Sequence, residues 1–251
     1  MIKFFRKLRR KVLAEGKFSR YLVYAIGEIA LVVVGILIAL WINNLNEGIR
    51  EAQIETNFLE GFRNDLIADG ITLREIIGHN EERMANSDSI IALLTHREQL
   101  GGMELTRFYH WNLSLAFESY FIPEKSTIRQ FEANSNGNLI TSRELKNKLF
   151  RYYSTCDRVE ANVEKSIQLY QHNFLTREII QNILSGEITS ILMGADLGRP
   201  AFDLDALKQN SAYIFALSTK KIATNNQNEV YYQLLHDVEE LVRLTEEALD
   251  Q

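Results

Sequence analysis

An unbroken apolar stretch, from Tyr21 to Ile42, constrains this chain more than any other feature. It reads YLVYAIGEIALVVVGILIALWI and carries one charged side chain, Glu28, in 22 residues. As an α-helix it would be about 33 Å long, enough to cross a hydrocarbon core of about 30 Å. Residues 29–42 are apolar on every face, which disfavours the core helix of a soluble protein. The stretch therefore predicts a single membrane-spanning helix.

Basic residues are concentrated on one side of this stretch. Residues 1–20 contain eight Lys or Arg and one acid, whereas residues 43–62 contain a single basic residue. By the positive-inside rule, the basic segment 1–20 should be cytoplasmic and residues 43–251 should form an extracytoplasmic domain.

A cleaved signal peptide would share the basic start and the apolar run. The run is longer than the usual 7 to 15 residues, and Trp41-Ile42-Asn43-Asn44 offers no pair of small residues for cleavage. We therefore expect an uncleaved signal anchor at residues 21–42.

One face of the predicted span carries small residues. Gly27, Gly35 and Ala39 fall on one four-residue row, with the larger Leu31 between them and Glu28 beside it. Small residues allow two helices to approach closely, and a carboxylate within a span is costly and often functional. Two interpretations stay open. One is a homo-oligomeric helix contact through this face. The other is isolated small residues, with a Glu28 that snorkels to the basic side, pairs with Arg20 or takes up a proton.

The composition of the remaining chain narrows its partners. Residues 1–42 hold eight of the 28 basic and two of the 33 acidic residues, so residues 43–251 carry a formal charge near −11. Such an acidic surface argues against nucleic acid as a partner. The single cysteine, Cys156, excludes an intrachain disulfide, and its place in an amphipathic pattern favours a buried thiol over an intermolecular bridge.

Helical periodicity dominates residues 43–251. The only prolines are Pro123 and Pro200, and apolar residues recur at steps of three and four. The pattern predicts an all-α fold, an antiparallel helical bundle on its membrane anchor. We expect helices over residues 54–99, 104–119, 126–133, 141–184 and 203–251, with a connector of about one helical turn at 186–202.

Three local features refine this prediction. Thr141 and Glu144 have the spacing of a capping box at the start of the fourth helix. The polar patch from Thr224 to Glu229 predicts a break or an exposed turn in the last helix. A bend is expected in the first helix, where Gly70, Asn80 and Ser87 interrupt the apolar stripe.

No catalytic, metal or cofactor motif is present. The chain lacks Glu-x-x-His, His-Glu-x-x-His, Gly-x-Ser-x-Gly, a P-loop and Gly-x-Gly-x-x-Gly. We therefore expect no enzyme activity, no metal and no cofactor. One aromatic group is dense enough to line an apolar pocket, although core packing is the commoner use of such a group. Its members are Phe108, Tyr109, Trp111, Phe117, Tyr120 and Phe121.

Three segments together resemble a known family. They read MIKFFRKLRRK, KFSRYLVYAIGEIALVVVGILIALWINN and STIRQFEANSNGNLITSRELKNKL. The chain resembles a family of uncharacterised single-pass membrane proteins of Bacteroidota, most closely in its first 45 residues. Position 41 departs from the family, which more often has a polar residue where this chain has Trp41. The resemblance implies a bacterial inner-membrane protein with a helical periplasmic portion, and supplies no activity or catalytic residue.

Two functions fit these features. The first is an interaction or scaffold protein of the cell envelope, whose acidic bundle docks an unidentified envelope protein. The alternative is a sensory or ligand-binding helical module. Because the cytoplasmic side has only about 20 residues, such a module would have to act through a partner helix.

Overall fold

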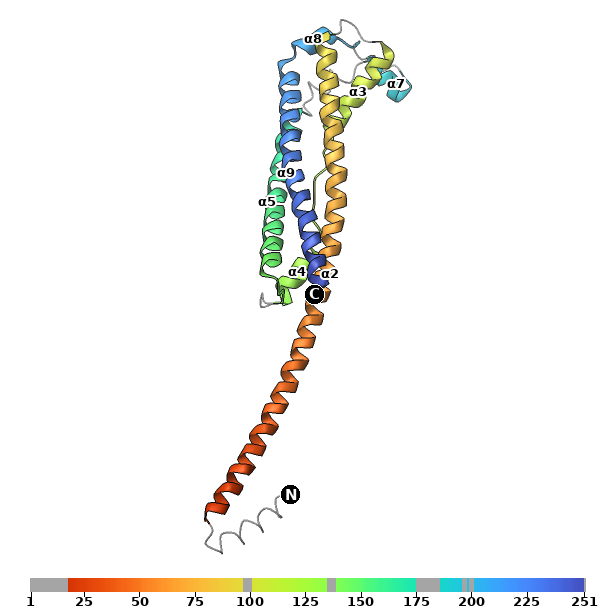
Figure 1. The fold of residues 1–251 in the computed structure, drawn as a ribbon. Coiled ribbons are helices and arrows are strands. Elements are labelled where there is room, and N and C mark those ends of the chain that lie inside the picture. The colour runs from red at the N-terminus through yellow and green to blue at the C-terminus, as the bar shows by residue number, and fades with distance from the viewer. Residues whose placement is uncertain are drawn as a thin grey trace. The chain divides into compact units, whose positions relative to one another are not determined.

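The computed structural model describes residues 18–96, 101–134, 139–174, 186–195, 198 and 201–250. Regular structure in these ranges is entirely α-helical, which confirms the predicted all-α fold (Figure 1). The chain divides into two units, Met1–Thr56 and Asn57–Gln251. The helices are α2 (Phe18–His96), α3 (Gly102–Ala116), α4 (Ser126–Asn134), α5 (Arg143–Phe174), α7 (Gly186–Met193), α8 (Leu204–Gln209) and α9 (Ser211–Leu249).

The first unit contains the N-terminal part of α2. Its apolar side chains, such as Leu31 and Trp41, are exposed, and none of the most apolar window is buried among the described residues. This is the one described helix long and apolar enough to cross a membrane. A soluble core helix would bury such side chains, so the exposure agrees with the predicted span.

Three long helices run through the second unit, namely the part of α2 after Thr56, α5 and α9. Ion pairs and hydrogen bonds between α2 and α9 connect Arg74 to Glu239 and Asn80 to Asn228, at 2.7 and 2.8 Å. Positions rise along α2 as they fall along α9, so these two helices are antiparallel. The segment 117–125 returns the chain from α3 to α4, and α5 then runs in the direction of α2, antiparallel to α9 (Figure 1).

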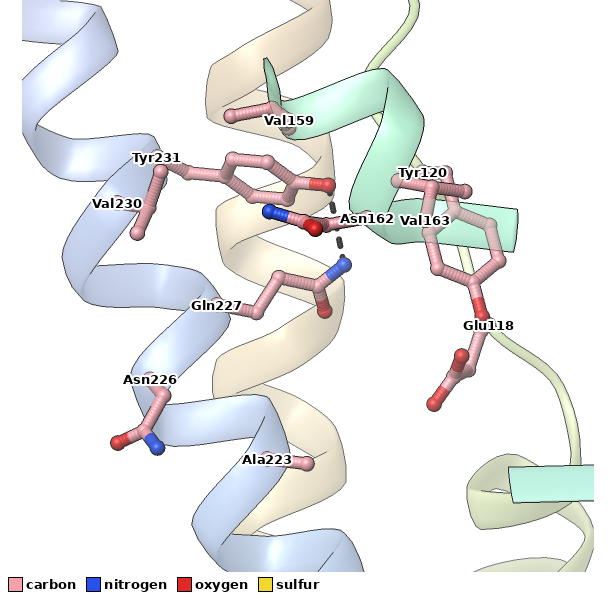
Figure 2. A pocket seen from close by; sticks show the side chains of 10 residues that line it. All are labelled: Glu118, Tyr120, Val159, Asn162, Val163, Ala223, Asn226, Gln227, Val230 and Tyr231. Carbon is pink, nitrogen blue, oxygen red and sulfur yellow. Dashed lines mark hydrogen bonds between the residues drawn. The ribbon is translucent and has the colours of Figure 1, made fainter. Parts of the chain in front are cut away.

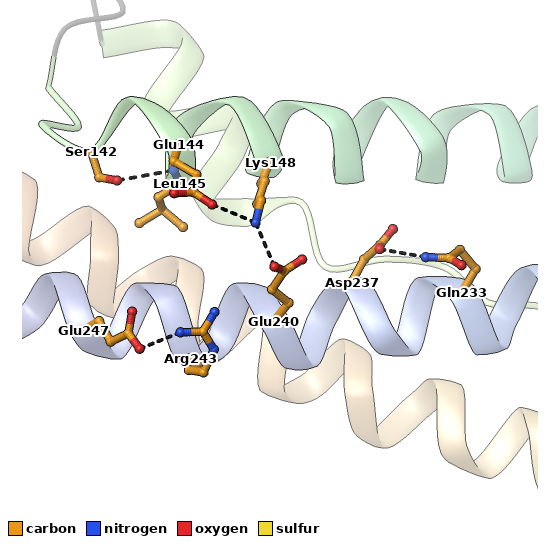
Figure 3. Close-up of polar contacts among 9 residues, drawn as sticks. All are labelled: Ser142, Glu144, Leu145, Lys148, Gln233, Asp237, Glu240, Arg243 and Glu247. Atoms are coloured by element: carbon orange, nitrogen blue, oxygen red, sulfur yellow. Dashed lines mark hydrogen bonds and ion pairs between the residues drawn. The ribbon is translucent and has the colours of Figure 1, made fainter.

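Charged side chains fasten the end of the bundle where α5 begins and α9 ends. The Lys148 ammonium lies 2.9 Å from Glu144, one turn earlier in α5, and 2.7 Å from Glu240 in α9 (Figure 3). Hydrogen bonding to these carboxylates raises the pKa of Lys148, and hydrogen bonding to Lys148 lowers the pKa of Glu240. These partly exposed contacts orient α5 on α9 and contribute little to stability.

Two apolar cores lie along α2 and α9. The first core contains Leu66 and Leu73 of α2, Tyr152 of α5 and Leu234 of α9. The second core contains Ile90 of α2, Phe108 of α3, Leu207 of α8 and Leu217 of α9. The stretches of α2 and α9 between these cores carry buried polar side chains, namely Asn80, Arg83, Ser87, Lys220, Thr224 and Asn228. We call this set the polar layer.

The polar layer explains why α9 does not break. The prediction of a turn from Thr224 to Glu229 is wrong, because α9 is helical throughout. Thr224 and Asn228 are buried, at 4% and 3% exposed, and Asn228 accepts a hydrogen bond from Asn80 of α2. Polar residues at helical spacing in this stretch therefore mark a buried face that is polar.

The cap of α5 differs by one residue from the prediction. The backbone N–H of Leu145 donates to Ser142 Oγ at 3.3 Å, so Ser142 rather than Thr141 caps this end (Figure 3). Glu144 pairs with Lys148 through its side chain.

Two further expectations concern helix ends and bends. Helix α2 is continuous through the stretch in which a bend is expected. At Gly70 in this stretch, an added Cβ would lie 3.2 Å from Val238 Cγ1 of α9. Gly70 therefore allows α9 to pack closely against α2. Helix α7 occupies about two turns of the predicted connector, whereas residues 175–184, assigned to the preceding helix, lie outside the described ranges.

Candidate functional site

The residues proposed for a helix contact within the membrane all lie on α2 in the first unit. They are Gly27, Glu28, Leu31, Gly35 and Ala39. A Cβ added to Gly27 or Gly35 would meet nothing within 4 Å, so both positions are open to a neighbouring helix. Contact with a second copy through this face stays a prediction.

The members of the aromatic group lie in different parts of the structure. Phe108 is buried in the second core, where Tyr109 and Trp111 pack half-buried against it, whereas Phe121 is buried in the first core. Phe117 is 66% exposed. The group separates because α3 ends at Ala116 and the chain continues in an extended conformation. Trp111 and Phe117 line a groove between α2 and α3, and Tyr120 lines a pocket between α5 and α9.

Hydrogen bonds connect the polar layer to the segment that follows α3. Asn80 Nδ2 donates to Asn228 Oδ1 at 2.8 Å and to Gln227 Oε1 at 3.2 Å. Arg83 donates through Nη1 to Asn80 Oδ1, and through Nη2 to Ser119 Oγ at 3.1 Å. Buried amides and guanidinium groups need such partners, and these bonds fix the side chains in place.

An ion pair joins this segment to α9. The Lys220 ammonium pairs with the Glu118 carboxylate, and their side chains are 1% and 15% exposed. Removal from water raises the pKa of Glu118 and lowers the pKa of Lys220, and the nearby positive charge of Arg83 lowers both. Burial thus moves the two pKa values towards each other, while the short contact between the two groups pairs their charges.

A pocket opens beside this ion pair, between α5 and α9 (Figure 2). Its volume is about 370 Å³, within the range of small-molecule sites. Helices α5 and α9 contribute a valine wall and three carboxamides, and the segment after α3 contributes a carboxylate and a tyrosine. The described residues that line it are Glu118, Tyr120, Val159, Asn162, Val163, Ala223, Asn226, Gln227, Val230 and Tyr231.

Tyr231 is held rigidly in the wall of this pocket. Its hydroxyl oxygen accepts hydrogen bonds from the backbone N–H of Phe121 at 3.1 Å and from Gln227 Nε2 at 3.0 Å (Figure 2). Gln227 is fixed in turn by the bond from Asn80 to its Oε1. Both lone pairs of the Tyr231 oxygen are therefore used, and its O–H proton is left to donate to a third group.

A second buried polar cluster lies within the first core. Asp69 accepts hydrogen bonds from Tyr152 Oη at 2.7 Å and from the backbone N–H of Glu124 at 2.8 Å. Burial raises the pKa of Asp69 to about 6, although both hydrogen bonds oppose that shift. The cluster holds the segment after α3 against α2 and α5, which is a structural role.

Cys156 lies beside this cluster and is completely buried, which confirms the predicted buried thiol. Burial raises the pKa of its thiol to about 12. Because the thiolate is the reactive form, Cys156 is not a nucleophile at neutral pH.

A metal site is not assembled in the searched part of the chain. No group of three or more His, Cys, Asp or Glu side chains comes together among the described residues. The site that the structure does assemble is the pocket beside the polar layer.

The sequence contained one signal for the polar layer. Lys220, Thr224 and Asn228 are four residues apart, in register with the buried Tyr213 and Tyr231. A polar row that continues an apolar helix face indicates burial with partners rather than a break in the helix. The pocket left no comparable signal, because its lining comes from three separate parts of the chain.

Comparison with known proteins identifies the family and no function. No curated protein and no solved structure matches this chain. A family model described as a family of unknown function (DUF6090) matches residues 28–153. Since this match covers half of the 251 residues, the chain belongs to that family of unknown function, DUF6090.

Proposed function

We propose that this protein is a membrane-anchored ligand-binding module of a bacterial cell envelope, which takes a small molecule into the pocket between α5 and α9. The observation that carries the proposal is a pocket whose polar wall is rigid and connected to a buried polar layer. Binding sites combine an apolar wall with a few fixed polar groups, and this pocket has both.

The stability cost of the polar layer supports a functional role. Burying Lys220, Glu118 and Arg83 requires removing three charges from water, whereas apolar side chains of similar volume often stabilise a core at least as well. Tyr231 and Gln227 connect this layer to the pocket wall. A ligand that hydrogen-bonds to the wall would therefore contact groups held by all three long helices.

The membrane anchor determines how such a module would act. We place residues 1–20 in the cytoplasm and the helical unit in the periplasm, on the basis of the basic N-terminal segment. The ligand-bound module would act through a partner helix or a second copy, and it needs no catalytic step.

A scaffold function is the second candidate, and a different feature favours it. An open groove of about 480 Å³ lies between α2 and α3, lined by Glu82, Asn86, His110, Trp111, Leu113, Ser114 and Phe117. Phe117 in this lining is 66% exposed, and Leu113 is 37% exposed. Exposed apolar side chains beside a groove are typical of docking surfaces. A partner lost on Phe117→Ser but kept on Val163→Trp would favour this function.

Filling the pocket tests the ligand-binding proposal. Val163→Trp places an indole in the pocket, and Ala161→Trp places the same group on an exposed position of α5 outside it. We expect fractions of a bacterial extract to raise the melting temperature of the full-length protein and of Ala161→Trp, but not of Val163→Trp. No stabilising fraction, or equal stabilisation of all three proteins, would contradict the proposal.

A further inference from the structure

We propose that the pocket between α5 and α9 recognises an uncharged, polyhydroxylated molecule of the size of a simple sugar. This inference rests on the function proposed above and specifies the chemistry of the ligand. Two features of the pocket point to such a ligand: the charge balance at Glu118 and the hydrogen-bonding character of the other lining groups.

Glu118 is the only charged side chain among the described residues that line the pocket. Lys220 pairs with its carboxylate from the core side, where Arg83 also lies close enough to shift its pKa. Neither cation is among the lining residues. The carboxylate is therefore balanced before any ligand enters.

A ligand of either charge would upset this balance. A ligand with an ammonium group would bring a third cation, besides Lys220 and Arg83, to the one carboxylate of Glu118. A ligand with a carboxylate would lie beside the negative charge of Glu118, which separates it from Lys220 and Arg83. In each case a partly desolvated charge would lack its own partner, which costs several kcal/mol. The charge balance therefore favours a neutral ligand.

The other polar lining groups both donate and accept hydrogen bonds. The carboxamides of Asn162 and Asn226 each offer an oxygen and an NH₂ group, and the Tyr120 hydroxyl also has both functions. Tyr231 supplies a fixed O–H donor, and the Glu118 carboxylate supplies acceptor oxygens. Hydroxyl groups match such a set because each of them donates one hydrogen bond and accepts others.

The apolar part of the pocket fits the carbon face of such a molecule. Val159 and Val163 of α5 and Val230 of α9 line it together with Ala223. Figure 2 shows Asn162 beside the Tyr231 hydroxyl and Val159 on the same helix, so that polar and apolar groups share one wall. A ring with hydroxyl groups at its edge and C–H groups on its face could contact both.

Matched sugars test the neutral character of the ligand. The full-length protein, in a detergent without a sugar head group, is titrated calorimetrically with glucose, N-acetylglucosamine and myo-inositol. The charged partners of these probes are glucosamine, which is cationic, and glucuronate, which is anionic. We expect at least one neutral probe to bind and to bind more tightly than both charged ones.

Variants locate the binding in the pocket. Asn162→Ala and Asn226→Ala should each weaken the binding of the neutral probe about fivefold, the usual effect of one lost hydrogen bond. Asn225→Ala is the control, since Asn225 is exposed, next to Asn226 and outside the lining. Glu118→Gln should weaken neutral binding by less than about tenfold, because an amide still accepts from a hydroxyl. The double variant Glu118→Gln with Lys220→Met repeats this measurement without an unpaired buried lysine.

Each alternative result has a distinct meaning. Three results would overturn the inference. They are tighter binding of glucosamine or glucuronate than of the neutral probes, no binding of any neutral probe, and an equal loss of binding in Asn225→Ala and Asn226→Ala. After either of the first two results, the ligand-binding proposal would still hold if an extract fraction stabilised the wild type and not Val163→Trp. If that effect is also missing, both proposals fail.

Discussion

Replacing Lys220 by methionine tests whether the polar layer depends on charge pairing. Methionine keeps the length of the lysine side chain and removes its ammonium. Glu118, only 15% exposed, would then lose the cation with which it pairs. Removal of one partner from a buried pair is usually destabilising, because the other charge remains buried.

The protonation of the Glu118 carboxyl group limits how much unfolding free energy Lys220→Met can lose. Glu118 can escape the penalty by taking up a proton, at a cost of about 1.36 kcal/mol for each pH unit above its ordinary pKa of 4.5. The penalty therefore cannot exceed about 3.4 kcal/mol at pH 7, or about 0.7 kcal/mol at pH 5. Arg83 still lies nearby, and the variant also removes the desolvation cost of the buried Lys220 ammonium, which opposes the loss. We therefore expect Lys220→Met to lose about 1 to 3 kcal/mol at pH 7 and less than about 1 kcal/mol at pH 5.

Urea unfolding of the full-length protein at both pH values measures this loss. Fluorescence of Trp111, which packs half-buried against the second core, reports the transition in a Trp41→Phe background. Lys221→Met is the control, because the adjacent Lys221 pairs with Asp88 at the surface and should contribute less than about 1 kcal/mol. The double variant Glu118→Gln with Lys220→Met should recover most of the stability. Wild-type stability of Lys220→Met at pH 7, or an equal loss at both pH values, would refute the reasoning.

Three further predictions concern the backbone, pH and the span. Gly61→Ala should destabilise the protein by about 1 to 3 kcal/mol, because the added Cβ would lie 2.8 Å from Thr127 Oγ1. Gly78→Ala should stabilise it by about 0.5 to 1 kcal/mol, because nothing lies within 4 Å of the added Cβ and alanine favours the helix. Shifts of the melting temperature with the same sign in both variants would contradict this. The pKa of Asp69 is about 6 in the folded protein and 3.8 in the unfolded chain, so the folded state binds the proton more tightly. As the pH rises from 3.8 to 6, the free energy of unfolding should therefore fall by about 3 kcal/mol. Asp69→Asn should remove that slope in urea unfolding, and an unchanged slope would exclude Asp69 as its source. Gly35→Ile should reduce crosslinking between copies in the membrane, and yields equal to the wild type would end the case for a helix contact through that face.

The helices could be predicted because their apolar residues repeat with the period of a helix. The structure confirms an apolar N-terminal helix followed by a helical bundle, and α4 begins at Ser126 as predicted. Periodicity identifies a buried face only where that face is apolar. In α9 the face becomes polar from Lys220 to Asn228, and the same rule then misreads a buried row as a turn.

The candidate site could not be predicted, because tertiary packing creates it. Glu118, Asn162 and Gln227 come from the segment after α3, from α5 and from α9, and they meet only when α5 and α9 pack together. Tertiary packing also separates the members of the aromatic group. Its members are close in sequence, but the end of α3 sends Phe108 and Phe121 to different cores.

Native mass spectrometry of the full-length protein, as isolated from cells, tests the central claim most directly. Wild type, Val163→Trp and Ala161→Trp are released from the same membranes, and their masses are compared for bound small molecules. We predict an added mass on the wild type and on Ala161→Trp that is missing from Val163→Trp, whose indole fills the pocket. The same added mass on all three proteins, or none on any of them, would contradict a ligand site between α5 and α9.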